Sequence, residues 1–395
     1  MLCFESLKVV DAATLFVGPL AAQKFAGYGV DVVKIKHPKY EDPARRHGPT
    51  KVGVGLGWKQ LARNKRAIAV DLSTDDGREV GIYLLKDTDV FIEDFRPRTL
   101  ERWGFRPEIL HNLNPRLVIA RVTGFGQFGP KSGEPGFGPL AETMVDFASM
   151  TGQADGPPPL PPLALADGIA GIATIFAAMA ALRSRDETGR GQVIDLAIIE
   201  AILAVLGPQI TAYKALGIVP QRNGNRSDKN ASRNNYRTRD HGWVAVSTSA
   251  QTVAERVMAL VGRTDLVKED WVSSGYGRAA NVEELDEAVW SWIAQRRAED
   301  FLHAFSLANA VVAPVYEVRD IVEDAHYKAL ETKVEVPDEE LGSVYLQNVV
   351  CRQSETPGEI RWAGASIGKH TNEVLTDLGF SKTRVGSMRA AGARR

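Results

Sequence analysis

The chain has 395 residues, of which 44% are hydrophobic and 25% are charged, as in an ordinary globular protein. This length is enough for a large core, and for two domains or one domain with a sizeable insertion. The formal net charge of −1 argues against a nucleic-acid binder or a membrane-surface protein. Cys3 and Cys351 lie at opposite ends and form neither a disulfide framework nor a zinc spacing, so a cytoplasmic location is expected.

The two ends of the chain and its longest apolar run bear on targeting and membrane insertion. The first residues, MLCFESLKVVDAA, lack the basic start and long apolar core of a signal peptide. The longest apolar run, Gly168 to Leu182, is rich in Ala and Gly and too short to cross a bilayer, so we expect a buried helix. The last stretch, TRVGSMRAAGARR, is basic and predicts a frayed tail. No membrane partner is expected.

Residues 6–125 alternate between short β-rich runs and helical patterns. The strand candidates are LKVVDAA, VDVVKIK, AIAVDL, TDVFIEDF and RLVIARVTGF. The helical stretches between them are VGPLAAQKFAGYG, DDGREVGIYLLKD and RPRTLERWGF. Strands separated by helices indicate βαβ units and a mostly parallel sheet. The sequence therefore predicts an α/β fold with a large Rossmann-like domain.

The middle of the chain combines loops, a long helix and one more strand. Two Gly- and Pro-rich loops, GFGQFGPKSGEPGFGP and QADGPPPLPPL, flank a helix predicted at about 140–151. A long helix starts at Asp167, and the turn DETGRGQ follows it. The strand VIDLAI then runs into a helix, IEAILAVLGPQI.

The residue composition changes near residue 215, where the segment VPQRNGNRSDKNASRNN is polar and predicts a loop or linker. HGWVAVSTS predicts a strand, and helices follow at about 250–262, 281–296 and 297–308, as in a smaller α+β domain. HTNEVLTDLGF predicts a helix that docks on the first domain. The expected domains are a large α/β part at 1–205, a linker at 206–225, a small α+β domain at 226–320, a linker at 321–340, and a return to the large domain at 341–395.

The first strand-to-helix turn has no dinucleotide-binding motif, and several catalytic motifs are absent from the sequence. The first strand-to-helix turn, DAATLFVGPLAA, lacks GxGxxG, and no GxxxxGK[ST] occurs, which argues against NAD and ATP. There is no GxSxG, no HExxH and no acidic metal cluster, and none of the 7 histidines marks a site. We therefore expect metal-free chemistry without a bound prosthetic group.

Asp167 stands between a proline-rich approach and the apolar run that starts at Gly168. Asp is a preferred N-cap, because its carboxylate accepts hydrogen bonds from the first free amides of a helix. A carboxylate held in a dry pocket can also be a nucleophile, and glycine amides nearby could hold an oxyanion. Capping and catalysis are compatible, so both interpretations stay open on the residues alone.

Motifs along nearly the whole chain resemble, in the same order, those of the family III CoA-transferases. This family includes formyl-CoA transferase, carnitine CoA-transferase and, as relatives, α-methylacyl-CoA racemases. The motifs are VVDAATLFVGP, AGYGVDVVKIKHP, LARNKRAIAVDL, VFIEDFRPRTLERWGF, LNPRLVIARVTGFGQFGP, LADGIAGIATIFAAMAALRSRDETGRGQVIDLAIIEA, the weaker DHGWVAV, and IGKHTNEVL. The resemblance implies an interlocked homodimer of ring-shaped protomers, with Asp167 as the family's nucleophilic aspartate.

The resemblance also implies which residues contact CoA. Formyl-CoA transferase has a functional Gln where this chain has Phe16, which argues against oxalate or formate as a substrate. Asp94 replaces an Asn of the family. The implied CoA contacts are Phe16 and Val17 in the first turn, His37 near the nucleotide, Val70, Asp71, Leu72 and Ser73 at the adenine end, Asp94 and Phe95 in the channel, and Arg102. Core packing or a solvated charge would explain several of them without a ligand, although Arg suits phosphate.

Three further positions bear on the activity. Glu142 lies where the family places a second active-site acid or amide, and an exposed helical Glu is the equal alternative. Residues 224–230 lie where formyl-CoA transferase has a closing glycine loop, but a solvated linker fits this polar segment better. The racemases need a His where this chain has Phe137, so racemisation lacks a base.

The implied function is transfer of CoA from an acyl-CoA donor, such as succinyl-CoA, to a free carboxylic acid. The expected intermediates on Asp167 are a mixed anhydride and an aspartyl-CoA thioester. The alternatives are an α-methylacyl-CoA racemase or epimerase, and a CoA-binding homologue without catalysis. CoA and acyl-CoA are thus expected as substrates rather than as bound cofactors.

Overall fold

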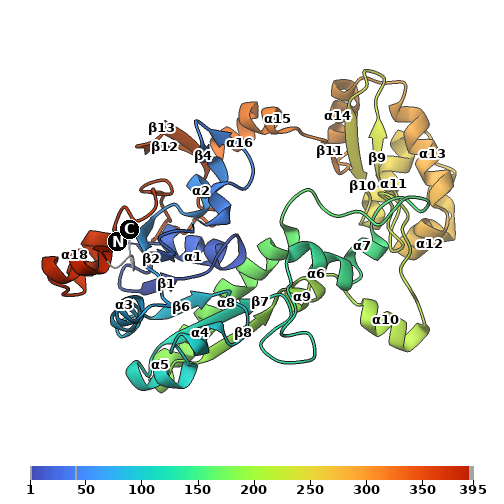
Figure 1. Cartoon of the computed structure of the whole chain (residues 1–395). Helices are drawn as coiled ribbons and strands as arrows, with labels where there is room; N and C mark the ends of the chain where they lie inside the picture. The colour runs from blue at the N-terminus through green and yellow to red at the C-terminus, as the bar shows by residue number, and fades with distance from the viewer. Residues whose placement is uncertain (1, 41, 391–395) are drawn as a thin grey trace. The chain divides into compact units, whose positions relative to one another are not determined.

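The computed structural model describes residues 2–40 and 42–390, and they form two compact units (Figure 1). Unit 1 is Met1–Phe147, Leu160–Pro208 and Lys328–Arg395, and unit 2 is Ala148–Pro159 and Gln209–Tyr327. A compact unit need not fold by itself, so the domain boundaries expected from the sequence stay a prediction.

Unit 1 is built on a single large sheet. Its strands are β1 (Lys8–Asp11), β2 (Asp31–Lys36), β5 (Lys65–Ala69), β6 (Val90–Glu93), β7 (Val118–Thr123) and β8 (Val193–Ala197). They lie in the order β5-β2-β1-β6-β7-β8, and every neighbouring pair is parallel. Counted along the chain this is the order 3-2-1-4-5-6 of a Rossmann sheet. The predicted parallel α/β sheet is therefore confirmed.

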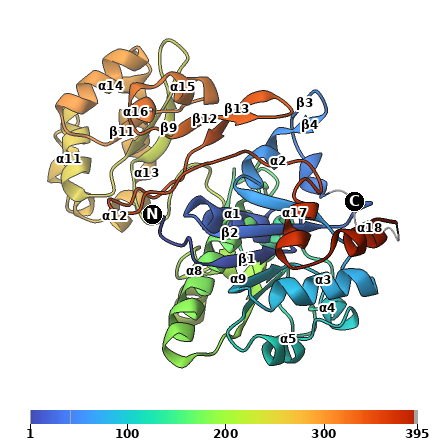
Figure 2. The ribbon, with the colours of Figure 1, turned by 90° about the vertical axis from the view of Figure 1, so that its left-hand side faces the viewer.

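Helices cover both faces of this sheet, because alternate strand residues point to opposite sides (Figure 2). Val9, Val32 and Val90 pack with α1 (Val17–Gly27) and α8 (Leu165–Thr188). On the other side, the apolar layer combines strand residues with α3, α5, α17 and α18. These helices span Asp75–Leu85, Pro107–Leu113, Thr371–Asp377 and Lys382–Ala390.

The C-terminal segment differs from the predicted frayed tail. Within residues 383–390 the chain forms α18, because Val385 and Met388 are buried in the apolar layer. Arg384 adds ion pairs of 2.6 Å to Asp76 and Glu79 of α3. The tail prediction is wrong for this part, and residues 391–395 lie outside the described residues.

The predicted helix at about 140–151 is in fact two short helices. They are α6 (Gly138–Met144) and α7 (Phe147–Met150), separated at Asp146, whose φ of 73° is left-handed. A left-handed residue cannot continue a right-handed helix, so the chain turns at this point.

The further elements of unit 1 are short. They are η1 (Pro43–Arg45), β3 (Thr50–Lys51), β4 (Val54–Gly55), α2 (Leu56–Leu61), α4 (Thr99–Arg102) and α9 (Ile198–Leu203).

The segment expected as a second linker, 321–340, contains regular structure. α15 (Val318–Glu323) and α16 (Ala325–Ala329) precede a hairpin of β12 (Lys333–Asp338) and β13 (Gly342–Gln347). The hairpin buries Val336, Val344 and Leu346 in a small separate cluster that also includes Ala363. Alternating apolar residues in β12 and β13 produce this one-sided burial.

Unit 2 contains a small antiparallel sheet and a group of helices. The sheet has the order β11-β10-β9, formed by Val312–Pro314, Trp243–Ser247 and Arg233–Arg237. The helices are α10 (Gln209–Leu216), α11 (Gln251–Leu260), α12 (Gly275–Ala280), α13 (Val282–Ile293) and α14 (Ala298–Leu307), with 3-10 turns at Leu266–Lys268 and Asp270–Ser273. Their core includes Val244, Phe301 and Phe305. Arg226, in the polar segment next to the expected linker, pairs with the Asp286 carboxylate at 2.9 Å.

The long apolar helix α8 is longer than the run identified in the sequence. It has 24 residues, and because an 18-residue window within it reaches a mean hydropathy of 1.9, it is the one helix among the described residues long and apolar enough to span a membrane. The expectation that it is too short is therefore wrong. Core helices of globular proteins meet the same criteria. Ala178, Ala181 and Leu182 pack against the sheet, but only 39% of the apolar window is buried, so the prediction of a buried helix is confirmed for one face alone.

Candidate active site

A cavity of about 140 Å³ lies at the carboxyl ends of the central strands of unit 1. β1 and β6 are neighbours, and the connections after them lead to opposite sides of the sheet order, β2 on one side and β7 on the other. Ligands of open α/β sheets bind at this kind of switch point. The lining residues are 14–17 after β1, 94–97 after β6, 122–125 at the end of β7, and 132, 134–137, 167 and 198.

Asp167 lines this cavity from the first turn of α8. The helix begins at Leu165 with Ala164 as its cap residue, so the N-cap interpretation of Asp167 is wrong. Burial raises the pKa of the Asp167 carboxyl, and the nearby Glu142 carboxylate raises it further. The N–H of Gly138 donates a hydrogen bond to Asp167, which opposes this shift of the pKa.

Glu142 performs the capping that was considered for Asp167. It lies on α6 and is 1% exposed, so the interpretation as an exposed helical Glu is wrong. Its Oε1 accepts a hydrogen bond of 3.0 Å from the N–H of Ala166, in the first turn of α8. This bond satisfies one of the amides that a helix start leaves free, and it ties α6 to the residue beside Asp167.

Glycines bring the backbone close to Asp167. A Cβ placed on Gly138 would lie 2.7–2.9 Å from the carboxylate atoms of Asp167. A Cβ on Gly124 would lie 2.6 Å from the Cα of Gly136, so the loop after β7 folds back on itself only because both residues lack side chains. The sequence marks this stretch as a Gly-rich loop, but spacing alone does not indicate which glycines face the aspartate.

Four of the expected CoA contacts lie around the same cavity as Asp167. They are Phe16, Val17, Asp94 and Phe95. Both oxygens of the Asp94 carboxylate accept hydrogen bonds from the N–H of Thr14, at 2.9 and 2.8 Å. Burial raises the pKa of Asp94 to about 6. Phe137 also lines the cavity, so the position at which racemases need a base is an apolar ring.

The expected contacts of the nucleotide end lie after β2 and β5, at the same edge of the sheet but outside this cavity. Nε2 of His37 lies 3.1 Å from the Asp71 carboxylate, which also accepts a 2.6 Å hydrogen bond from the Ser73 hydroxyl. Val70 and Leu72 are buried in the apolar layer, so their side chains pack in the core.

Arg102 is exposed on α4, and its Nη2 donates to the Thr99 hydroxyl at 3.0 Å. It lines a hollow with three further arginines, which sequence reasoning had not identified. These are Arg98, Arg106 and Arg121, and Glu101 and Glu108 line the same hollow. Arg121 is neutralised by ion pairs to Glu93 and Glu101, while paired donors of the other arginines suit a phosphate.

Metal ligation has no candidate here: in residues 2–40 and 42–390 no group of three or more His, Cys, Asp or Glu side chains could hold a metal ion.

Known proteins share this fold and order of motifs. Residues 4–371 match the sequence model of CoA-transferase family III, so the chain belongs to this family. The resemblance seen in the sequence is thereby confirmed. Membership defines the protein more closely as an enzyme, a CoA-transferase acting on CoA thioesters.

The chain is 33% identical over 375 residues to succinyl-CoA–D-citramalate CoA-transferase of Chloroflexus aurantiacus, covering 95% of this chain and 93% of that protein. It is 34% identical over 389 residues to the beta subunit of succinyl-CoA–L-malate CoA-transferase from the same bacterium, covering 97% and 96%. Among solved structures, a CAIB/BAIF family protein from Brucella suis superposes with a TM-score of 0.83 at 26% identity, covering 96% of this chain and all of that one.

Proposed function

We propose that this enzyme transfers CoA from succinyl-CoA to a small dicarboxylic acid, with Asp167 as the nucleophile. The observation that carries the proposal is a half-buried carboxylate lining a cavity at the switch point of the sheet. The substrate class is supported by relatives whose names specify succinyl-CoA with D-citramalate or L-malate, and succinate with glutarate. All of these acids carry two carboxylates.

In the proposed reaction the Asp167 carboxylate attacks the thioester carbonyl of the donor. The C–S bond breaks, CoA leaves as a thiolate, and the acyl group is joined to Asp167 as a mixed anhydride. The thiolate then attacks the aspartyl carbonyl, which releases the donor acid and forms an aspartyl-CoA thioester. The acceptor carboxylate attacks this thioester, giving a second anhydride and thiolate. Attack of that thiolate on the acceptor carbonyl releases the new acyl-CoA and free Asp167.

The surroundings of Asp167 suit these steps. Each intermediate would be destroyed by water, and the apolar rings of Phe16, Phe95 and Phe137 line the cavity. A partly desolvated carboxylate is also the better nucleophile. We assign Glu142 the role of second active-site acid, acting through its bond to Ala166 rather than on substrate.

We further propose that CoA follows the carboxyl edge of the sheet. Phe16, Val17 and Phe95 would contact the acyl end of the molecule in the cavity, and Asp94 would lie beside it with both oxygens bonded to the Thr14 N–H. His37 and residues 70–73 would lie at the adenine end, where backbone groups of Val70 and Leu72 are the available contacts, and Arg102 would bind phosphate. No prosthetic group is required for this chemistry. The racemase alternative has no support from the cavity, because Phe137 cannot move a proton.

We also propose an interlocked homodimer in the cytoplasm. Large apolar side chains are exposed on α8, where Ile172 is 61% and Phe176 is 77% exposed, and such faces are usually covered by a partner. In unit 2, α10 has no buried residue and its Leu216 is 73% exposed. One relative is named as a beta subunit, so a related second chain is the competing partner. The free, exposed Cys3 and Cys351 are compatible with a reducing compartment.

The test is mass spectrometry of purified enzyme with succinyl-CoA and a panel of dicarboxylic acids. We expect a new acyl-CoA with at least one acid, and hydroxylamine should convert Asp167 of the working enzyme to a hydroxamate. Asp167→Ala should lower transfer by at least about 1,000-fold while CoA binding persists. Transfer retained in Asp167→Ala would rule out the nucleophile, and CoA binding without any transfer by the wild type would favour a non-catalytic homologue.

A further inference from the structure

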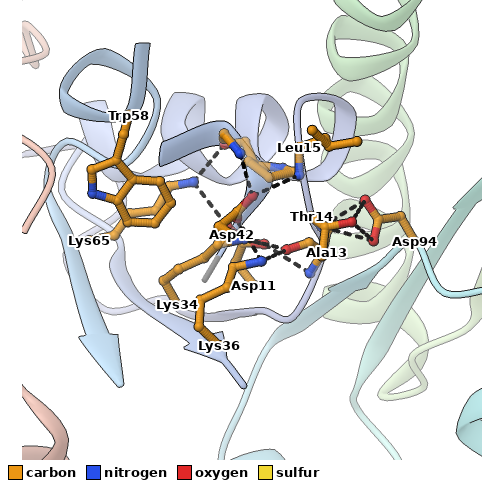
Figure 3. A network of polar contacts seen from close by, with 12 residues as sticks. Asp11, Ala13, Thr14, Leu15, Lys34, Lys36, Asp42, Trp58, Lys65 and Asp94 are labelled. Atoms are coloured by element: carbon orange, nitrogen blue, oxygen red, sulfur yellow. Dashed lines mark hydrogen bonds and ion pairs between the residues drawn. The ribbon is translucent and has the colours of Figure 1, made fainter. Parts of the chain in front are cut away.

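The peptide group that joins Ala13 to Thr14, just after β1, is held by charged side chains at both ends (Figure 3). The carbonyl oxygen of Ala13 accepts hydrogen bonds from Nζ of Lys34 at 2.5 Å and Nζ of Lys36 at 2.6 Å. The N–H of Thr14 donates to both oxygens of the Asp94 carboxylate, at 2.9 and 2.8 Å. Two cations therefore hold one end of the peptide dipole and one anion holds the other. Charge-assisted bonds of this kind are stronger than neutral ones.

The next peptide group is also held by a carboxylate, at its N–H end. The N–H of Leu15 donates to Oδ1 of Asp42 at 3.2 Å, and Oδ2 of Asp42 pairs with Lys36 at 2.6 Å. Leu15 has a φ of 58°, a left-handed conformation that a residue with a large side chain rarely adopts. Such a conformation persists when its surroundings determine it, and here the surrounding groups are charged.

These groups belong to one buried cluster of opposite charges. Lys34 and Lys65 pair with the two oxygens of Asp11, at 2.8 and 2.9 Å. Lys34, Lys36 and Lys65 are thus matched by Asp11, Asp42 and Asp94, all of them buried except the part-buried Asp94. Buried ions are tolerated only when they are paired, so removal of one anion would leave an uncompensated lysine. Among these six residues, Asp94 is the one that lines the cavity.

The held segment leads directly into the cavity wall. Residues 14–17 line the cavity, and α1 begins at Val17 without a side-chain cap. The direction in which Phe16 and Val17 enter the cavity therefore depends on the two peptide groups before them. A loop held only by van der Waals contacts would leave this entry less well defined.

We propose that Asp94 is a positioning residue of the transferase, which with Lys34 and Lys36 fixes the 13–14 peptide group and thereby the wall formed by residues 14–17. The proposal rests on the proposed function only in taking this cavity as the acyl-CoA site. The carboxylate charge is needed as well as its oxygen atoms, because it completes the balance of the buried lysines. An Asn at position 94 offers one acceptor oxygen and no charge.

The first measurement is hydrogen exchange by mass spectrometry on the ligand-free enzyme, followed in a peptide that covers residues 12–17. In Asp94→Asn we expect the Thr14 and Leu15 amides to exchange at least about tenfold faster than in the wild type. The matched control is Asp89→Asn. Asp89 also accepts a backbone N–H, that of Lys8 at 2.8 Å, but it precedes β6 whereas Asp94 follows it. Unchanged exchange in Asp94→Asn would overturn the proposal.

The second measurement separates positioning from general damage. Asp94→Asn should raise the dissociation constant of CoA by about tenfold and the KM for acyl-CoA similarly, while kcat falls less. Asp89→Asn should move neither. Faster exchange with unchanged CoA affinity would also overturn the proposal. Exchange and CoA affinity need no turnover, so they support or refute the role of Asp94 even if the enzyme transfers CoA to none of the tested acids.

Discussion

At the scale of single residues, the environment of Asp167 determines how it can react. Burial and the neighbouring Glu142 carboxylate both raise the pKa of Asp167, so less of this carboxyl is ionised at mildly acidic pH than for an exposed Asp. In the folded enzyme this carboxyl binds a proton more tightly than in the unfolded chain. Its contribution to stability therefore declines as pH rises through the raised pKa, while the ionised form that the proposed mechanism requires increases.

The pH dependence of kcat/KM tests this environment. We expect kcat/KM to fall as pH falls through the pKa of Asp167, because the protonated carboxyl cannot attack a thioester. Glu142→Gln keeps an oxygen that can accept the Ala166 N–H but removes the charge, so the acid limb should move to lower pH. Burial raises the pKa of the Asp94 carboxyl to about 6, so Asp94 titrates in the same pH range. Because Asp94 is unchanged in Glu142→Gln, it contributes equally to the pH profiles of the wild type and the variant. An acid limb at the same pH in Glu142→Gln would contradict the effect of the Glu142 charge on the pKa of Asp167.

Gly138→Ala tests the contact between the loop and the aspartate. The added methyl group would lie within 2.9 Å of the Asp167 carboxylate, so one of the two must move. A displacement near 1 Å can cost about 100-fold in rate, and we expect a loss of kcat/KM of that order. Gly386→Ala in α18, where a Cβ meets nothing within 4 Å, is the control. Equal activity of both variants would show that the close approach is not needed.

At the scale of elements, the sequence predicted the strands that are continuous apolar runs and missed shorter or more polar ones, among them the hairpin of β12 and β13. The five strand candidates before residue 125 are β1, β2, β5, β6 and β7, since continuous apolar runs mark buried parallel strands. The two-residue strands β3 and β4 are too short to show a period. The end of α6 depends on a left-handed Asp146, and composition does not reveal that conformation.

The buried ions at the carboxyl ends of β1, β2 and β5 should matter for stability. Burial alone would raise the pKa of Asp11, but the charges of its lysine partners outweigh this effect and lower the pKa to about 2. Because this pKa is lowered, the stabilising contribution is complete above the ordinary value near 3.8 and is lost as pH falls toward 2. Asp11→Asn should lower the free energy of unfolding by about 3–5 kcal/mol, because it leaves buried lysines unpaired.

Urea unfolding measures this effect. The control is Asp87→Asn, which removes an exposed ion pair with Lys8 and should cost less than about 1 kcal/mol. Similar losses in the two variants would mean that the buried pairs contribute no more than a surface pair.

At the scale of the whole molecule, the proposed dimer depends on apolar surface that the single chain leaves exposed. Ile172→Glu with Phe176→Glu places charges on that face of α8, and we expect the dimer to dissociate in analytical ultracentrifugation because charges are depleted at interface cores. Ile109→Glu on α5, another exposed apolar position, is the control and should leave the dimer intact. A wild-type monomer that binds a related second chain would favour the subunit arrangement named for one relative.

The sequence by itself determined the family, the parallel sheet and the aspartate at the start of the long helix, because these depend on local order along the chain and on motif spacing. Only the tertiary structure decided that Glu142 is buried and caps α8, that Gly138 approaches Asp167, and that Asp94 and two lysines hold one peptide group. Each of these contacts joins segments distant in the sequence. Their energies come from desolvation and hydrogen-bond geometry, which arise only once the strands have placed their carboxyl ends side by side.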